Sequence, residues 1–180
     1  DRTVHWKPAD ALGFPTLTAE YGVTLTEFRP VLSTTGQVNE VTVQGWDPQQ
    51  KASVTATVTS AKLAPTATGL GKRGPAIAQS AFSSAKLHVG SHDGKQPAVQ
   101  AVAQAVYDRM AASDVTAEAR LRGNPGLKPG GKLTVQKVGT RFSGTYLVTR
   151  TRHVFTVEDA LMTDVWLGGM NSGTLGAIIG

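Results

Sequence analysis

The sequence has 180 residues and a formal net charge of +5, and its length accommodates one good hydrophobic core with room for a smaller appendage, that is, one or two domains. Charged residues make up only 17%, while Gly (20) and Pro (9) are plentiful and Thr and Val recur, which favours β-structure and argues against an all-helical bundle. The absence of cysteine excludes disulfides, thiolate catalysis and Cys-ligated zinc together.

The positive charge does not indicate a nucleic-acid partner, because the Lys and Arg residues are spread thinly and alternate with Thr and Ala. No run of about eighteen apolar residues is present to span a bilayer, so we expect no stable membrane insertion. The chain opens at Asp1 rather than at Met and shows no start typical of a signal peptide. We therefore expect a fragment of a longer protein.

The N-terminal part predicts four strands, of which only the last two are expected to pair with each other. Residues 16–28 alternate between apolar and polar and are broken at Tyr21-Gly22, which indicates two short strands. Two further alternating runs lie between Val38 and Thr59 and should pair as a hairpin. The segment Trp46 to Lys51 separates them, and its Asp47-Pro48 step is typical of a chain reversal.

The middle of the chain contrasts a long irregular stretch with one helix. Residues 61–96 are rich in Ala, Ser, Gly and Pro, which predicts a long surface loop, mobile between Pro65 and Ser84. Pro97 suits the first turn of a helix, where its missing N–H costs no hydrogen bond. We expect this helix over 97–112, because one stripe collects Val99, Val102, Ala103, Val106, Tyr107 and Met110.

The C-terminal part predicts four strands, over 115–123, 132–138, 144–157 and 161–168. In the first, Glu118, Arg120 and Arg122 share the face that meets water, and Ala117, Ala119 and Leu121 share the face that meets the core. The turns at Asn124-Pro125-Gly126 and Lys128-Pro129-Gly130 should be type II, with glycine taking the positive φ at the third position. The fold class is therefore mainly β (α+β), a barrel or sandwich with one packed helix.

Two groups of residues superficially suggest ligand sites. His88 and His92 are four apart with Asp93 beside them, but Gly90 and Gly94 interrupt the stretch and no third metal ligand is evident. The glycines from Gly69 to Gly74 lack the spacing of a phosphate-binding loop and follow no buried strand. A solvated loop explains both groups better than a metal or cofactor site does, and we expect neither.

Hydrolytic chemistry is no better supported. Ser172 sits in Asn-Ser-Gly, without the glycine-flanked elbow of a serine hydrolase. Glu158, Asp159 and Asp164 are close enough in sequence for paired-carboxylate catalysis, but the first two are expected in a solvent-facing turn. We predict no catalytic residue.

Arginines occupy the longest expected strand. Simple alternation places Arg150 and Arg152 on one face with Tyr146 and Val148. Two readings stay open for this face, a solvated surface or the lining of a subunit contact or channel.

Several segments together resemble the hub region of the spike protein of contractile injection systems, the VgrG and phage late control gene D protein family. Gly45-Trp46-Asp47-Pro48 is the most specific of them. The others occur in the same order as in the family: 20–22, 27–34, 37–44, 116–118, 123–130 and 142–153. The resemblance spans most of the chain from Leu17 to Gly168.

This resemblance implies a phage tail-tube type of β-domain and a non-enzymatic, structural role. The implied assembly is a homotrimeric hub that connects a hexameric tail tube to a needle, with tail-tube and baseplate proteins as partners. It implies assembly in the cytoplasm into a phage-like particle, with release outside the cell as one outcome. Residues 1–30 would end a preceding hub subdomain, 31–170 would form the tube-like domain, and 171–180 would link to an OB-fold and needle that this sequence lacks.

Two alternatives remain open at the level of sequence. A peptidoglycan-degrading hydrolase domain of a tail hub would use the C-terminal acids, and a surface-binding or carbohydrate-binding β-domain is permitted by the strand pattern alone. Turnover of purified peptidoglycan would favour the hydrolase. Glycan binding by a monomer would favour the surface-binding or carbohydrate-binding domain.

Overall fold

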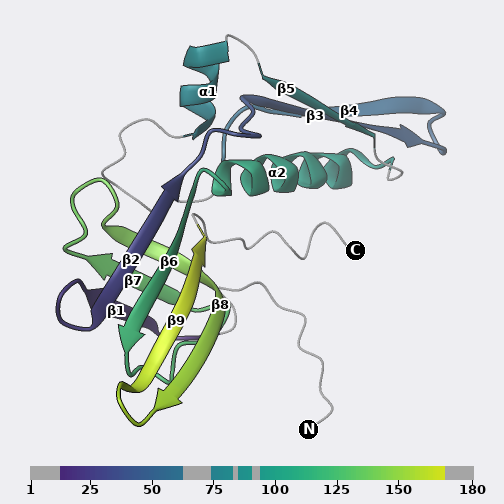
Figure 1. Ribbon diagram of the computed structural model, residues 1–180. Coiled ribbons are helices and arrows are strands. Elements are labelled where there is room, and N and C mark those ends of the chain that lie inside the picture. The colour runs from purple at the N-terminus through teal and green to yellow at the C-terminus, as the bar shows by residue number, and fades with distance from the viewer. Residues whose placement is uncertain (1–12, 63–73, 83–84, 91–93, 169–180) are drawn as a thin grey trace, which may run out of the picture. The chain divides into compact units, whose positions relative to one another are not determined.

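A computed structural model describes residues 13–62, 74–82, 85–90 and 94–168. These residues form two compact units, each with its own sheet. Of the described residues, the first unit contains 13–33 and 115–168, and the second contains 34–62, 74–82, 85–90 and 94–114 (Figure 1). The predicted mainly β class is confirmed, with a second helix added to the one expected.

The first unit is a six-stranded sheet. Its strands are β1 (Thr16–Glu20), β2 (Leu25–Leu32), β6 (Val115–Arg122), β7 (Lys132–Gln136), β8 (Gly144–Thr156) and β9 (Ala160–Gly168). Their spatial order is β1-β7-β8-β9-β6-β2. The pairing is antiparallel throughout, except that β1 runs parallel to β7.

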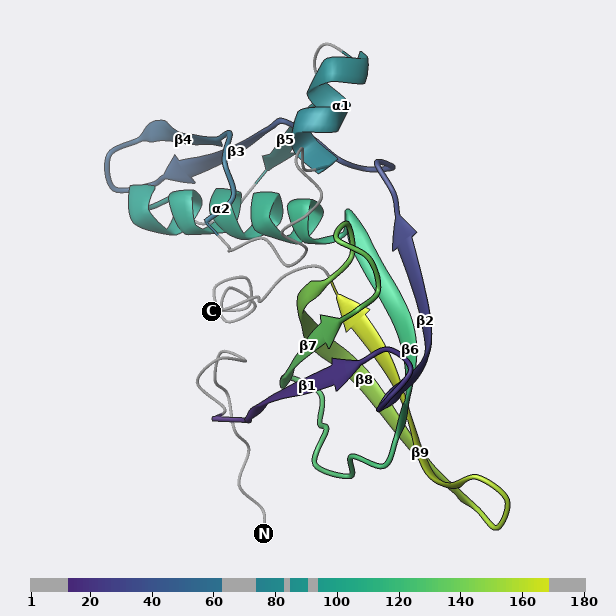
Figure 2. The ribbon, with the colours of Figure 1, turned by 90° about the vertical axis from the view of Figure 1, so that its left-hand side faces the viewer.

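Curvature of this sheet follows from its connections. β1 and β2 stand at opposite ends of the strand order, yet only residues 21–24 join them. So short a link requires the sheet to curl until its two end strands approach each other. The turn is closed by hydrogen bonds from Gly22 N to Leu25 O (3.0 Å) and from Val23 N to Glu20 O (3.1 Å). Figure 2 shows the resulting curled sheet.

The hydrophobic core of this unit lies on the inner face of the curl. β6 contributes Ala117, Ala119 and Leu121, the face that its alternation predicts. Tyr146 is fully buried, packs edge-on against Phe28 at 6.0 Å between ring centroids, and donates a hydrogen bond from its hydroxyl to Phe142 O (2.6 Å). The phenol therefore fills the core without leaving its polar atom unpaired.

The second unit is a three-stranded sheet packed on a helix. Its elements are β3 (Glu40–Asp47), β4 (Ala52–Val58), α1 (Gly74–Phe82), β5 (Lys86–Gly90) and α2 (Gln96–Ala112). The predicted hairpin is confirmed: β3 and β4 pair antiparallel, and Asp47 Oδ1 accepts hydrogen bonds from Gln49 N (2.8 Å) and Gln50 N (3.1 Å) in the turn. Val41, Val43, Ala56 and Val58 are buried on the face toward α2.

The predicted helix over 97–112 is confirmed as α2, with Pro97 in its first turn. Its buried side also holds polar groups that fix the chain after β4. Asp108 Oδ1 accepts hydrogen bonds from Lys62 N (2.9 Å) and Gln104 Nε2 (3.0 Å), and the Tyr107 hydroxyl donates to Thr59 O (3.0 Å). Burial, and next the charge of Asp108, raises the pKa of Tyr107. Neither helix of the described chain is long and apolar enough to cross a membrane.

The expectation of one long loop over 61–96 is wrong for two of its parts. Gly74–Phe82 is helical, with proline at its second residue, and Lys86–Gly90 is a strand. β5 pairs parallel with β3, and Asn39 secures its start: Asn39 N donates to Ala85 O, and Asn39 Oδ1 accepts from Ala85 N, both at 2.9 Å. A five-residue strand carries too little alternation to be recognised without its partner. Residues 63–73, 83–84 and 91–93 lie outside the described chain.

One of the two predicted turn types is also wrong. Gly130 takes a φ of +88° and Gly131 N donates to Lys128 O (3.0 Å), as the type II prediction requires. In the other turn Leu127 N donates to Asn124 O (3.2 Å), but the positive φ values fall on Gly123 (+68°) and Asn124 (+65°), not on Gly126. The two residues with left-handed backbone, Gly123 and Asn124, thus follow the end of β6, before the central residues of the turn.

Candidate functional site

Only one member of the histidine cluster noted in the sequence lies in the described part of the chain. His88 lies exposed on β5, and its expected neighbours His92 and Asp93 fall outside the described residues. Within the described parts of the chain, no three His, Asp or Glu side chains are grouped closely enough to hold a metal ion. Of the glycine-rich stretch only Gly74 is described, as the first residue of α1, and Ser172 lies beyond the last described residue.

The three C-terminal acids occupy different parts of one hairpin. Glu158 and Asp159 lie exposed in the turn between β8 and β9, where Asp159 N donates a hydrogen bond to Thr156 Oγ1 (3.0 Å). Asp164 lies within β9, with its side chain only 12% exposed. Asp164 thus lies within a strand beside two arginines, whereas the other two acids lie in an exposed turn.

The predicted face of the two β8 arginines is wrong, because the strand contains a β-bulge. Val148 pairs with Leu167, whereas Arg150 pairs with Trp166, so Thr149 is an extra residue in β8. One inserted residue reverses the alternation after it. Tyr146 and Val148 are buried, and Arg150 and Arg152 stand on the opposite, outer face. The Thr149 hydroxyl donates to Trp166 O (2.9 Å) and fixes the bulge.

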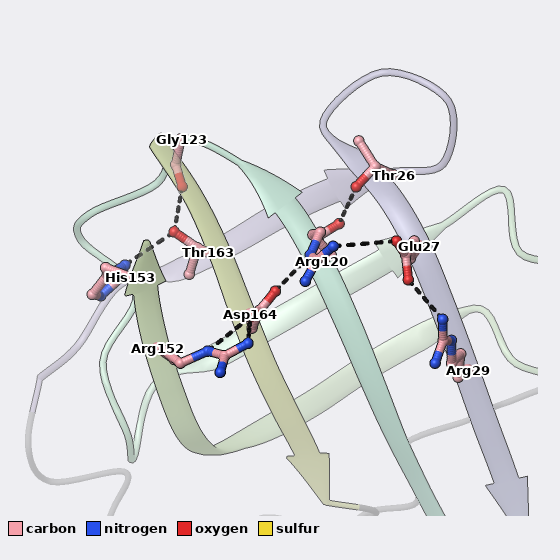
Figure 3. A network of polar contacts seen from close by, with 9 residues as sticks. All are labelled: Thr26, Glu27, Arg29, Arg120, Gly123, Arg152, His153, Thr163 and Asp164. Carbon is pink, nitrogen blue, oxygen red and sulfur yellow. Dashed lines mark hydrogen bonds and ion pairs between the residues drawn. The ribbon is translucent and has the colours of Figure 1, made fainter. Parts of the chain in front are cut away.

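The bulge places Arg152 in a polar network on the outer face of this unit, which we call the outer-face network: Glu27, Arg29, Arg120, Arg152 and Asp164. Glu27, Arg120, Asp164 and Arg152 come from four neighbouring strands and face one another in register across the sheet. Figure 3 shows them as a row in which negative and positive groups alternate. Opposite charges placed directly across strands stabilise a sheet, whereas like charges would destabilise it.

Short contacts join the members of this row. Arg120 Nε donates to Asp164 Oδ1 (2.7 Å), and Arg152 donates to Asp164 Oδ2 through Nη2 (2.5 Å) and Nε (3.0 Å). Arg120 Nη1 lies 3.5 Å from Glu27 Oε1, and Arg29 Nη2 lies 3.1 Å from Glu27 Oε2. Asp164 is the centre of the network, because both of its oxygens accept from arginines.

The electrostatics of Asp164 follow from these contacts. The hydrogen bond from Arg120 is the largest influence and lowers the pKa of Asp164, partial burial opposes this, and Arg152 lowers the pKa further. The hydrogen bond to Asp164, and next the charge of Asp164, raise the pKa of Arg120 above its ordinary value. Asp164 is therefore held as a carboxylate, a state unsuited to donating a proton near neutral pH.

A second row runs beside the first and contains an aromatic side chain. Trp166 Nε1 donates a hydrogen bond to Glu118 Oε1 (3.0 Å), and the Arg150 guanidinium lies 4.6 Å from the centre of the Trp166 ring. Arg29 pairs with Glu118 in the register of β2 and β6. The arginine over the ring face makes a cation–π contact that holds the indole against the sheet.

Two shallow depressions flank Trp166 on this face. One, of about 200 Å³, is lined mainly by members of the two rows. The other, of about 510 Å³, is more apolar and is lined by Val31, Thr116, Ala117, Thr149 and Leu167 together with Arg29, Glu118, Trp166 and Gly168. The arrangement suits a rigid surface for contact with another macromolecule, because its charged groups are committed to one another.

Sequence reasoning anticipated part of this surface. The alternation of β6 places Glu118 and Arg120 on the solvent face, as found. Trp166 and Glu27 were missed as partners of those residues. Their signal is detectable only after β9 and β2 are known to flank β6, because neither residue belongs to a local motif.

The family model described as the Alg8 N-terminal domain matches residues 1–157. The chain belongs to this Alg8 N-terminal domain family. Its description names a domain and no activity. No curated protein matches the sequence.

Solved structures similar to this Alg8 N-terminal domain include phage-type tail proteins. The tail protein from Neisseria meningitidis MC58 matches with a TM-score of 0.66 at 13% identity, over 95% of this chain and 48% of that protein. The 43 kDa tail protein of prophage MuSo2 from Shewanella oneidensis matches with a TM-score of 0.58 at 11% identity, over 84% of this chain and 42% of that protein. The chain thus spans about half the length of these proteins or less. The resemblance to a phage-tail type of protein is confirmed at the level of fold.

Proposed function

We propose that this chain is a structural domain in the spike hub of a phage-tail-like contractile injection system, where the full-length protein trimerises to connect the tail tube to the needle. The observation that carries the proposal is the fold shared with the Neisseria meningitidis tail protein over 95% of the chain. The ordered family-like segments from Leu17 to Gly168 support the narrower assignment to the VgrG-type hub.

The surface of the first unit supports a role in assembly. β1 and β2 end the strand order, and within the described residues each pairs with one strand only. Unpaired strand edges attract further strands, and ring closure in an oligomer covers them. The apolar depression beside Val31 borders the β2 edge. Tail-tube and baseplate proteins would be the other partners.

In this proposal the domain has a structural role and no enzymatic one. It is supported by the commitment of Asp164 to two arginines and by the exposed turn positions of Glu158 and Asp159. The proposal includes assembly in the cytoplasm into a phage-like particle and a continuation after residue 170 into an OB-fold and needle.

The mass of the full-length protein in solution tests the proposal. Light scattering coupled to gel filtration, at about micromolar concentration, should give three times the chain mass. The 180-residue piece serves as the comparison, because the needle is expected to supply much of the stability of the trimer. A full-length protein that remains strictly monomeric would contradict the trimeric hub. Turnover of purified peptidoglycan, lost on Asp159→Asn, would contradict the non-enzymatic role.

A further inference from the structure

The outer face of the small sheet carries a neutral, hydrogen-bonding surface with one exposed aromatic ring. In β3 the residues Thr42, Gln44 and Trp46 point away from the buried Val41 and Val43. Register places Thr57, Thr55 and Ser53 of β4 beside them in turn, and His88 of β5 beside Thr42. We call this set of seven side chains the threonine face.

The threonine face has a shallow depression and an aromatic rim. The depression, of about 230 Å³, is lined by Thr42, Gln44, Thr55, His88, Val89 and Gly90. Trp46 lies two residues beyond Gln44 on the same side of β3 and is 55% exposed. Alternation therefore places the indole beside the last row of hydroxyl and amide groups.

Hydrogen-bonding capacity remains available on this face. Thr42 Oγ1 and Thr57 Oγ1 lie 3.1 Å apart and share one hydrogen, so the second hydroxyl hydrogen and further lone pairs remain. Among the described residues, the side-chain amide of Gln44 and the hydroxyl of Thr55 have no hydrogen-bond partner. The face thus offers both donors and acceptors at fixed positions on a sheet.

The position of Trp46 is fixed by its own backbone. A Cβ built on Gly94 would lie 1.8 Å from Trp46 O and 2.6 Å from Asp47 Cα, so the chain before α2 rests directly on this end of β3. Only glycine permits so close an approach. The backbone beneath the exposed ring is therefore held on both sides, by β4 and by the chain at Gly94.

We propose that the threonine face binds a neutral oligosaccharide, with one sugar ring stacked on Trp46 and hydroxyl groups paired with Gln44 and Thr55. Sugars present apolar ring faces together with many donors and acceptors, which matches an aromatic ring beside neutral polar groups. This inference stands independently of the proposed hub function.

Other occupants fit the face less well. A nucleic acid would require cations that contact phosphates, and the lining of the depression contains no Lys or Arg. The nearby Lys86 is already paired with Glu40 at 3.1 Å. A stable protein interface would require an apolar centre, whereas Trp46 is the only large exposed apolar side chain among the seven.

The test is a titration of the full 180-residue chain with each of four sugars: maltohexaose, cellohexaose, xylohexaose and N-acetylchitohexaose. Binding is monitored through the indole N–H signal of Trp46 in nuclear magnetic resonance spectra. We expect saturable shifts with at least one of them, at a Kd of roughly 0.1–1 mM. Trp46→Ala should weaken binding at least about tenfold, since it removes the aromatic face on which the sugar ring stacks. Thr55→Val, which keeps the shape of the side chain, should weaken it about threefold.

The matched control is Phe155→Ala, which removes an aromatic side chain that is 77% exposed on β8 of the other unit. It should bind as the parent chain does. Absence of saturable shifts with all four sugars up to about 10 mM would overturn the proposal. Sugar binding that Trp46→Ala leaves unchanged would also overturn it. The same holds for self-association of the chain through this face, detected by sedimentation and abolished by Trp46→Ala.

Discussion

Arg120 and Asp164 face each other across β6 and β9, and Arg120 Nε donates a hydrogen bond of 2.7 Å to Asp164 Oδ1. Arg152 binds the other oxygen of the same carboxylate from β8. One side chain of β9 thereby joins both of its neighbouring strands on the outer face. Asp164 is the point at which this surface is most sensitive to substitution.

Asp164→Asn should destabilise the protein by about 2 kcal/mol, because it leaves two arginines without their shared charge. The free energy of unfolding in urea, monitored by circular dichroism, measures the effect. Glu158→Gln is the matched control, since it removes an exposed acid from the turn of the same hairpin. Equal stability of the two variants would show that the network contributes nothing to folding.

The contribution of Asp164 to stability should depend on pH in a defined direction. Its pKa is lowered in the folded state, so the contribution is fully present above the unfolded pKa of about 3.9 and is lost as the pH falls through the lower folded pKa. The difference in unfolding free energy between the parent chain and Asp164→Asn should therefore be constant near neutral pH and shrink in acid. A difference that grows on acidification would contradict this assignment.

Gly94→Ala should destabilise the second unit by about 2 kcal/mol or more, because the new Cβ would collide with the Trp46 carbonyl at 1.8 Å and neither backbone can yield cheaply. Gly90→Ala provides a matched comparison, since a Cβ there meets nothing within 4 Å. Thermal unfolding of the two variants measures the contrast. Similar melting temperatures would mean that the chain at Gly94 does not rest on β3.

Tyr146→Phe should cost about 1–2 kcal/mol, because the partly buried Phe142 carbonyl loses the hydroxyl that lies 2.6 Å from it while the aromatic packing is retained. Tyr21→Phe, at a side chain that is 50% exposed, should change stability far less. Urea unfolding of both variants gives the comparison. A larger loss for Tyr21→Phe would argue against the described core.

Much of the fold could be predicted because its signals are local. The alternation of residues 116–122 identifies both faces of β6, Pro97 marks the start of α2, and Asp47 forms the turn that joins β3 and β4. Each depends on residues within a few positions of one another, which is the range over which backbone sterics and side-chain capping act.

The errors have a common origin in contacts between distant segments. The bulge at Thr149 is visible only against Leu167 and Trp166, and it places Arg150 and Arg152 on the face opposite to Tyr146 and Val148, with which simple alternation groups them. β5 acquires strand structure from its pairing with β3, which precedes it by more than forty residues. Residue patterns within one segment carry no record of such partners.

Local residue patterns specify which residues of most strands meet water and where the chain turns, since these depend on the period of side-chain direction and on local backbone preferences. Which strands are neighbours, and therefore that Glu27, Arg120, Asp164 and Arg152 form one row, follows from the folded chain alone. The difference arises because ion pairing and hydrogen bonding act through space over a few ångströms, and the register between strands brings together groups that lie far apart along the chain.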